Sequence, residues 1–187
     1  MKEVIMEAVK VLKEGGVILY PTDTVWGIGC DATNEEAVKK VFAIKKRSEA
    51  KSLVTLAADL DMVAMHVREI PSIAIDLVEV NDAPMTIIYP GAEHLAPSVV
   101  AEDGSVGIRI PNHEFCVELM KRLRRPLVST SANISGEPTP ACWQEISEEI
   151  RSAVDYVVPR RYEEGASGKA SQIIKLGLKG EVEIIRA

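Results

Sequence analysis

The sequence predicts a single α/β domain over residues 1–187, with a mixed β-sheet and helices on its faces. A chain of 187 residues is within the range of one domain, and 47% hydrophobic with 27% charged residues is an ordinary globular composition. Segments with helical periodicity and segments with strand character alternate irregularly, which favours a mixed sheet over a purely parallel one. No repeat or linker divides the chain.

The amino-terminal segment predicts a helix and a buried strand, followed by a polar stretch. Met1–Glu14 places its apolar side chains on one helical face, and two glycines follow as a stop signal. Val17–Tyr20 is typical of a buried strand, which Pro21 ends. The stretch 22–29 follows directly with two threonines, an aspartate and two glycines, and a strand end is where open α/β sheets bind ligands.

The next segment predicts a helix and strand, followed by two short helices. Asn34 is a good N-cap for a helix that ends in the basic run Lys45–Arg47, and Leu53–Leu56 follows as a strand. The two short helices, each with a candidate cap, are Leu60–Val67 after Asp59 and Ile73–Val80 after Ser72.

Strand signals dominate the second half of the chain. The even-numbered residues of Ser105–Pro111 should face the core, while Ser105, Gly107 and Arg109 share the opposite face, where an arginine and a hydroxyl can bind an anion. The expected elements are strands Met85–Tyr89, Ser105–Pro111, Pro126–Val128, Ala153–Val158, Ser171–Leu176 and Glu181–Arg186, with helices His113–Leu123 and Trp143–Ile150.

The stretch Ser129–Gly136 follows a buried strand and is rich in small polar residues. Hydroxyls, one amide and a glycine supply hydrogen-bonding groups and leave room for a ligand beside the backbone. The same residues are also common in turns. The stretch therefore predicts either a ligand pocket or a capped turn.

Composition narrows the function classes. The formal net charge of −6 argues against a protein that coats nucleic acid, so any phosphate contact needs a local basic patch. The three cysteines lack metal-ligand spacing and the three histidines are scattered, so we predict no metal site. No apolar run is long enough to span a bilayer and no signal peptide is evident, so we expect a cytoplasmic protein without membrane contact.

One local basic patch is evident. Lys45, Lys46, Arg47 and Lys51 lie within seven positions at the end of a predicted helix. Cations at a helix end complement its dipole and are often simply solvated. Four of them this close together can also bind a polyphosphate.

Four separated segments carry a common pattern. In chain order, the segments are Tyr20–Gly27, Lys45-x-Arg47, Val106–Pro111 and Ser129-x-Ser131-Ala132-Asn133-x-Ser135-Gly136. Together they resemble the YrdC/Sua5 family, the threonylcarbamoyl-AMP synthases of tRNA modification. The resemblance covers nearly the whole chain. It implies a twisted mixed sheet flanked by helices around a basic concave cavity, in the short, single-domain form of the family.

The resemblance also implies a reaction and its participants. ATP, L-threonine and bicarbonate would give threonylcarbamoyl-AMP and pyrophosphate, for transfer by a tRNA threonylcarbamoyltransferase complex to adenosine 37 of tRNA. Mg²⁺ would accompany ATP without a protein cage of its own. A weak direct contact with tRNA is a further expectation.

Site residues follow from the resemblance position by position, with no catalytic residue assigned. The positions implied for ATP are Lys45, Arg47, Lys51, Ser105, Ser131, Asn133, Thr139 and Arg186. The positions implied for threonine are Thr24, Arg109, Ser129 and Ser171, with Arg109 on the carboxylate.

The chain departs from the family pattern at several positions near the threonine side. The departures are Trp26, Ser48, Leu56, Asp82-Ala83-Pro84 and Ala170-Ser171-Gln172. They keep two alternatives open. One is a paralogue that binds a nucleotide or acyl-adenylate but makes another product. The other is a module for structured RNA that uses the basic run Lys121–Arg125.

Overall fold

The computed structural model describes residues 1–47 and 53–187. The strands are β1 Ile18–Tyr20, β2 Gly27–Gly29, β3 Val54–Leu56, β4 Met85–Tyr89, β5 Val106–Arg109, β6 Leu127–Ser131, β7 Tyr156–Val157, β8 Gln172–Leu176 and β9 Val182–Arg186. The helices are α1 Lys2–Lys13, α2 Glu35–Lys45, α3 Leu60–His66, α4 Ser72–Val80, α5 Glu114–Leu123 and α6 Glu148–Ala153, with 3₁₀ turns at Pro97–Val99, Trp143–Glu145 and Arg160–Tyr162.

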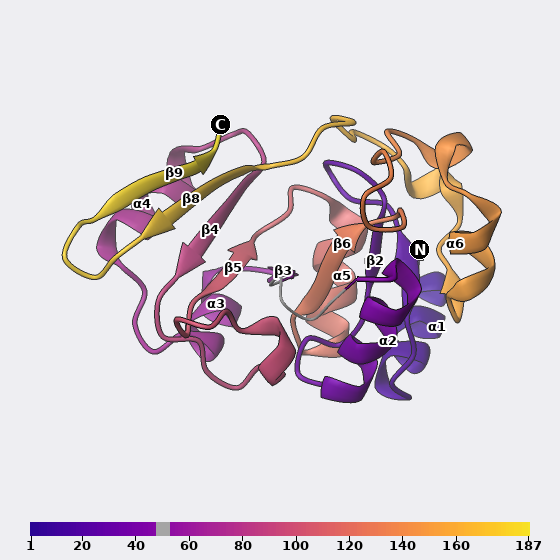
Figure 1. Ribbon diagram of the computed structural model, residues 1–187, viewed down its shortest axis with the longest axis horizontal. Coiled ribbons are helices and arrows are strands. Elements are labelled where there is room, and N and C mark those ends of the chain that lie inside the picture. The colour runs from indigo at the N-terminus through magenta and orange to yellow at the C-terminus, as the bar shows by residue number, and fades with distance from the viewer. Residues whose placement is uncertain (48–52) are drawn as a thin grey trace.

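In these two ranges the strands form one nine-stranded sheet in the order β7-β1-β2-β6-β3-β5-β4-β8-β9 (Figure 1). The neighbours β1 and β2 are antiparallel, whereas β3 and β5 are parallel. The predicted mixed α/β sheet is therefore confirmed. The centre of the sheet, β6-β3-β5, brings together residues that are far apart in sequence.

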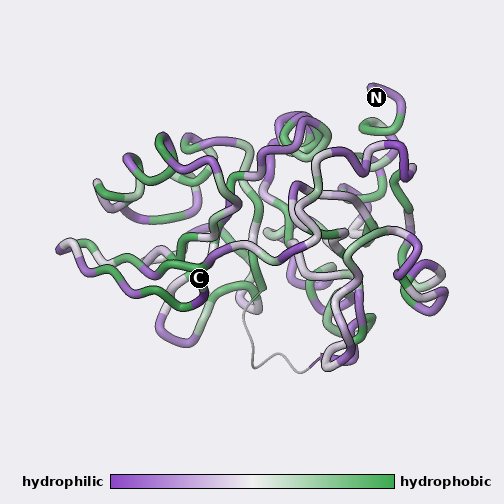
Figure 2. Tube along the Cα trace, turned by 90° about the horizontal axis from the view of Figure 1, so that it is seen from above, coloured by the Kyte–Doolittle hydropathy of each residue, from purple (hydrophilic) through white to green (hydrophobic). Residues whose placement is uncertain are grey.

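Helices α1, α4 and α5 lie behind the sheet in the view of Figure 1, and the view from above agrees (Figure 2). Helix α1 buries Ile5, Ala8, Val9 and Leu12 and packs on α5, as its apolar face predicts. At the far end of the sheet, α4 lies beside the hairpin β8-β9 (Figure 2). No helix among the described residues is both long and apolar enough to cross a membrane.

Two of the predicted N-caps are confirmed. The side chain of Asn34 accepts a hydrogen bond from the backbone N–H of Ala37 at 3.1 Å, and Asp59 accepts from Met62 at 2.8 Å. Ser72 was expected to cap α4, but it is the first helical residue and Pro71 holds the cap position without a side-chain bond. The expectation for Ser72 is therefore wrong.

Two segments outside the predicted strands are strands in the structure. Gly27–Gly29 forms β2, because it pairs with β1 on one side and with β6 on the other. Strand β6 runs on through Ser131, since its ladders with β2 and β3 include Ser129 and Ser131, and the loop starts only at Ala132. Pairing with distant strands outweighs the turn preference of these small residues.

The expected helix Trp143–Ile150 is also wrong. The structure has a 3₁₀ turn at Trp143–Glu145, and α6 begins only at Glu148, after Ser147. The Ser147 side chain caps α6 by accepting from the backbone N–H of Ile150 at 3.3 Å. A local cap inside the apolar pattern therefore divides the segment in two.

The two glycines of β2 predict unequal effects of substitution. A Cβ on Gly29 would lie 2.1 Å from the backbone oxygen of Val128, whereas one on Gly27 would lie 3.1 Å from the side-chain oxygen of Ser129, which can move. We expect Gly29→Ala to lower the free energy of unfolding by roughly 3 kcal/mol, the upper end of overpacking costs, and Gly27→Ala to cost less. Urea denaturation of both variants measures this, and equal losses would contradict the packing argument.

Candidate functional site

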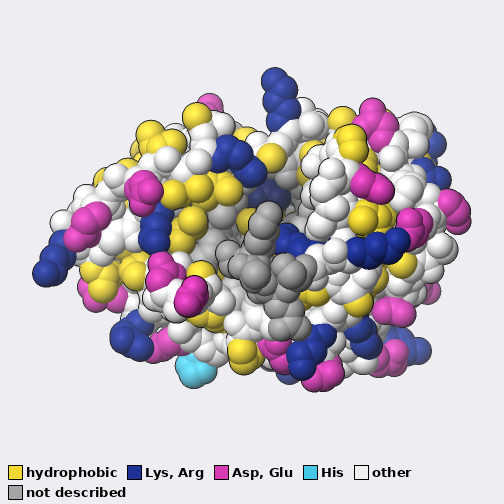
Figure 3. Space-filling view, viewed as in Figure 1, with side chains coloured by type: hydrophobic (Ala, Val, Ile, Leu, Met, Phe, Trp, Pro, Cys, Tyr) yellow, Lys and Arg dark blue, Asp and Glu magenta, His cyan; other side chains and the backbone are white. Residues whose placement is uncertain are grey.

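A cavity of about 390 Å³ lies where the end of α2 meets the loop after β6. We call it the lysine cavity. It is lined by Lys45, Lys46, Arg47, Thr130, Ser131, Asn133, Ser135 and Gly136. Four of the residues expected to bind ATP therefore line one space, namely Lys45, Arg47, Ser131 and Asn133. In the space-filling view, Lys and Arg side chains lie in a hollow in the middle of the molecular face (Figure 3).

Hydrogen bonds of Lys45 join the two walls of this cavity, the end of α2 and the segment Ser131–Ser135. The Lys45 ammonium donates to the backbone oxygens of Ser131 at 2.6 Å and Asn133 at 2.9 Å, and the Ser135 N–H donates back to the Lys45 carbonyl at 2.9 Å. The residue is only 2% exposed. Burial, together with the charge of Arg47, lowers the pKa of Lys45 to about 8. Two of its three donors thus hold the β6 loop in place.

The next two cations of the basic patch, Lys46 and Arg47, differ from Lys45. Lys46 has a left-handed backbone with φ 51° and pairs with Glu149 at 2.6 Å, where both side chains are exposed. Arg47 is half-buried, and burial lowers the pKa of its guanidinium. Lys51, the remaining predicted phosphate ligand of the run, lies outside the described residues.

Asn133 uses part of its side chain within its own loop. The amide nitrogen donates to the carbonyls of Ile134 and Glu137, both at 3.0 Å, while the amide oxygen is buried with no hydrogen-bond partner. The pattern combines both interpretations of Ser129–Gly136, because the amide nitrogen stabilises a turn while the residue still lines a cavity. A buried acceptor without a donor is costly, so the oxygen is available to a ligand.

A second cavity of about 420 Å³ lies over β5, β4 and β8 and contains Ser105, so we call it the Ser105 cavity. Its walls are mainly apolar and its rim is polar. The lining residues are Leu53, Val54, Thr86, Ile88, Ala101, Glu102, Asp103, Ser105, Val106, Gly107, Ile173, Lys175 and Ile185. Ser105 donates to Asp103 at 2.5 Å, and Lys175 pairs with the same carboxylate at 2.8 Å.

Arg109 lies at the end of β5 in a buried ion pair with Asp23 of the β1–β2 loop. The second guanidinium nitrogen donates to the Thr24 hydroxyl at 3.2 Å, so the structure brings together two residues expected on the threonine side. Sequence reasoning did not include Asp23 in the site. Its position beside Thr24, in a polar stretch after a strand, was the only available signal.

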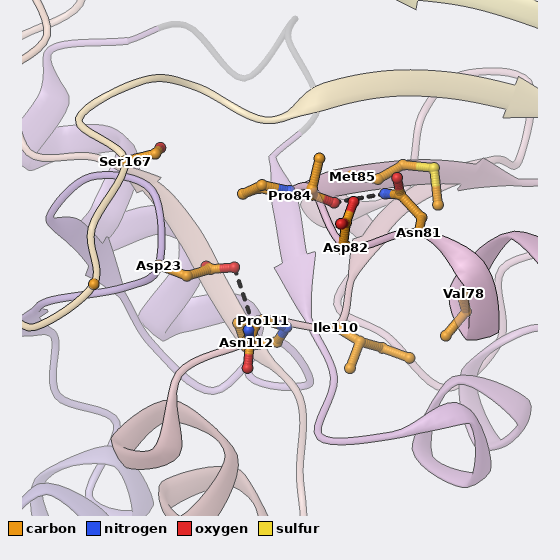
Figure 4. Close-up of a pocket in the computed structure, with 12 residues that line it drawn as sticks. Asp23, Val78, Asn81, Asp82, Pro84, Met85, Ile110, Pro111, Asn112 and Ser167 are labelled. Atoms are coloured by element: carbon orange, nitrogen blue, oxygen red, sulfur yellow. Dashed lines mark hydrogen bonds between the residues drawn. The ribbon is translucent and has the colours of Figure 1, made fainter.

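Asp23 also lines a third cavity of about 440 Å³, drawn in Figure 4 and called here the Asp23 cavity. The other carboxylate oxygen of Asp23 accepts from the backbone N–H of Asn112 at 3.0 Å. The segment Asn81–Met85 forms the opposite wall, and Gly165 and Ser167 come from the loop before β8. No lysine or arginine is among the lining residues that the structure describes, so this cavity is not suited to phosphate.

The remaining predicted site residues are spread around these cavities. Ser171 is buried, its hydroxyl 2.8 Å from that of Thr86, and its carbonyl accepts from Arg186 at 2.8 Å. Ser129 is half-buried in β6, opposite Val54. Thr139 is exposed on the loop after Gly136 and is not among the described residues that line the lysine cavity.

Of the departures from the family pattern, Trp26 and Leu56 lie in the core, whereas Asp82 and Ala83 are exposed. Leu56 is fully buried in β3, in register with Arg109 and Leu127. Trp26 is 1% exposed and packs against Trp143, with ring centroids 5.0 Å apart. Ala83 contributes its carbonyl to the side chain of Asn81 at 2.5 Å. Ser48 lies outside the described residues.

Other titratable groups have structural partners. The ring of His113 is 2.9 Å from the carbonyl of Tyr162, and burial lowers the pKa of His113 and of His66. In the run Lys121–Arg125, Arg125 pairs with the buried Asp31 at 2.6 Å. Within residues 1–47 and 53–187, no group of three or more His, Cys, Asp or Glu is placed to hold a metal ion.

Comparison with known proteins gives consistent matches. The family model Sua5_yciO_yrdC, with the description Telomere recombination, matches residues 10–187. Two similar proteins are named Threonylcarbamoyl-AMP synthase. One from Pseudomonas aeruginosa is 35% identical over 81% of this chain and 82% of its own length. One from Stenotrophomonas maltophilia is 36% identical over 84% of this chain and 87% of its own length.

The fold is similar to that of a solved structure, P. abyssi Sua5 complexed with L-threonine. The TM-score is 0.82 at 28% identity, and the match covers 92% of this chain and 50% of the archaeal one. The chain thus spans about half the length of that protein. The matched region includes most of the sheet described above, so the architecture is shared.

The low pKa of Lys45 predicts a pH dependence of stability. Between about pH 8 and 10.5 the unfolded chain binds more protons at this lysine than the folded chain, so the free energy of unfolding should rise with pH. Relative to Lys45→Met, the wild type should gain about 1 kcal/mol or more from pH 8 to 9.5. Chemical denaturation at both pH values measures the difference.

The control for this measurement is Lys39→Met, which removes an exposed lysine of the same helix. If the difference between the wild type and Lys45→Met does not change with pH, the lysine is not held in the desolvated state that the geometry implies.

Proposed function

The chain belongs to the Sua5/YciO/YrdC family, and on that premise we propose that it is an L-threonylcarbamoyladenylate synthase. It would join ATP, L-threonine and bicarbonate into threonylcarbamoyl-AMP and release pyrophosphate. The observation that carries the proposal is the lysine cavity, in which cations at the end of α2 face the hydroxyls and the amide of β6 and the loop that follows it. Such a lining suits phosphate oxygens.

The position of the Ser105 cavity supports a nucleotide that extends across the sheet. Val54 of β3 lies in that cavity and is paired with Ser129 of β6, two residues before Ser131 of the lysine cavity. The two cavities are therefore on neighbouring strands. Apolar walls with a polar rim suit an adenosine, while the lysine cavity suits the phosphates.

The cluster of Asp23, Arg109 and Thr24 supports the proposed binding of the amino-acid substrate. Arg109 uses one nitrogen for Asp23 and another for Thr24, and a guanidinium has five N–H donors in all. The remaining donors are suited to a carboxylate. The protein in the similar P. abyssi structure is complexed with L-threonine, as that structure's title says.

The proposed chemistry needs positioning more than a protein base. The threonine amine and bicarbonate form a carbamate with loss of water, the carbamate oxygen attacks the α-phosphorus, and the bond to the β-phosphate oxygen breaks as pyrophosphate leaves. Cations beside the leaving phosphates stabilise the charge that develops there. The clamp of Lys45 on the β6 loop fixes the distance between those cations and the loop.

Mg²⁺ is expected to come with the triphosphate. The lining described for the lysine cavity contains no carboxylate, so it offers no protein ligand of the kind that Mg²⁺ prefers. Phosphate oxygens and water would therefore hold the metal.

The product would pass to a tRNA threonylcarbamoyltransferase complex in the cytoplasm. Direct RNA contact would be weak at most, because the net charge is −6 and the most basic run has Arg125 paired with an aspartate.

The decisive experiment is detection of the product by mass spectrometry. Purified protein incubated with ATP, bicarbonate and L-threonine should form threonylcarbamoyl-AMP, and omission of any one substrate should abolish it. Hydrolysis or adenylation without this product would instead indicate a paralogue with another acceptor.

Two neighbouring cations provide a matched test of the phosphate site. Arg47→Ala should raise the Kd for ATP about tenfold or more, because it removes a charged donor from the half-buried wall of the lysine cavity. Lys46→Ala removes the same formal charge from an exposed side chain that is paired with Glu149, so it should change the Kd much less. Calorimetry with ATP measures both, and equal effects would contradict the assignment.

A further inference from the structure

The hydroxyls of Thr22 and Thr24 form a hydrogen-bond chain beside Arg109. Thr22 is 1% exposed, and Thr24 and Arg109 are each 4% exposed. The Thr22 oxygen lies 2.7 Å from the carbonyl of Val25 and 3.0 Å from the hydroxyl oxygen of Thr24. It also accepts from the backbone N–H of Thr24 at 3.1 Å.

The direction of each bond in this chain follows from counting protons. A carbonyl can only accept, so the single hydroxyl hydrogen of Thr22 goes to Val25. The bond between the two hydroxyls therefore needs the hydrogen of Thr24. One donor and two acceptor positions of the Thr22 hydroxyl are then all in use, so Thr22 has no capacity left for a ligand.

Arg109 uses one of the two acceptor positions of the Thr24 hydroxyl. A guanidinium only donates, so the Thr24 oxygen accepts from Arg109 at 3.2 Å, while the hydrogen of Thr24 is already used in the bond to Thr22. The Thr24 hydroxyl is left with one free lone pair and no free hydrogen. It can accept a hydrogen bond but cannot donate one.

We propose that Thr22 is a positioning residue that makes Thr24 an acceptor for an N–H or O–H group of the amino-acid substrate. This rests on the proposed function, in which Thr24 and Arg109 face that substrate. A carboxylate has no hydrogen to offer Thr24, so it must lie on the donors of Arg109. The amine or the side-chain hydroxyl then lies toward Thr24, which fixes how the amino acid enters the site.

The test measures binding of two amino acids by calorimetry. L-Threonine carries both donor groups, whereas L-2-aminobutyrate lacks only the hydroxyl. Thr24→Val keeps the shape and removes the acceptor, so it should weaken L-threonine binding by about two- to tenfold. Loss of the wild type's preference for threonine over aminobutyrate identifies the hydroxyl as the donor, whereas equal weakening of both identifies the amine.

Thr22 variants test the positioning role. In Thr22→Val, the Thr24 hydrogen loses its acceptor and can turn toward the ligand, so L-threonine binding should weaken about as much as in Thr24→Val. Thr22→Ser keeps the hydroxyl and should bind L-threonine like the wild type. The Kd for ATP and the melting temperature of each variant control for general loss of structure. If Thr22→Val does not fold, Thr22→Ala removes the same hydroxyl and replaces it in the comparison with Thr22→Ser, and wild-type threonine affinity in Thr22→Ala overturns the positioning role.

The outcomes separate this inference from the proposed function. A wild type that binds no L-threonine overturns both. If the wild type makes threonylcarbamoyl-AMP but Thr24→Val binds threonine as tightly, only this inference fails. A folded Thr22→Val with wild-type affinity, next to a weakened Thr24→Val, would show that Thr24 contacts the ligand without control by Thr22.

Discussion

The arrangement of the β1–β2 loop and the end of β5 depends on the buried ion pair of Asp23 and Arg109. The pair joins the β1–β2 loop to the end of β5, although β6 and β3 lie between the strands β2 and β5 in the sheet. The backbone carbonyls of Asp23 and Thr24 also accept bonds at 2.9 Å from Ser167 and Gly168. Removal of either partner would leave a buried unpaired charge, at a cost of about 3–5 kcal/mol. The ion pair therefore couples the positions of the β1–β2 loop and the end of β5.

A second buried charged group, the ammonium of Lys45, fixes the walls of the lysine cavity. Lys45 is a buried cation whose described partners are the carbonyls of Ser131 and Asn133. Carbonyl dipoles satisfy its protons but leave its charge without a counter-ion, and the lowered pKa reflects that burial. An anion in the lysine cavity would supply the missing charge. In the proposed function, a cation that is already desolvated and held in place would contribute to the binding energy for phosphate.

The sequence predicted many features that depend on neighbouring residues, although the Ser72 cap and the helix Trp143–Ile150 were wrong, and it missed most of what depends on distant residues. Helix α1, its apolar face and the caps Asn34 and Asp59 are local features, and each was predicted correctly. The extension of β6 through Ser131 depends on ladders with β2 and β3, which override local turn preference. The cluster of Lys45, Arg47, Ser131 and Asn133 in one cavity followed from the family resemblance. The role of Asp23 depends on a partner 86 positions away, which no local pattern indicates.

The two halves of the site differ in how they use hydrogen bonds, and the difference suits the reaction. On the phosphate side, the described groups that face the lysine cavity include donors and cations, which match oxygens that can only accept. On the amino-acid side, Arg109 donates and Thr24 accepts within about one hydrogen-bond length of each other, which matches a substrate that carries both a carboxylate and a donor. In the proposed reaction, the threonine amine would have to keep one orientation while bicarbonate and the α-phosphorus approach in turn. A site that fixes the polarity of its hydroxyls before the substrate arrives needs no reorganisation at that moment, and preorganised dipoles of this kind stabilise a transition state most effectively.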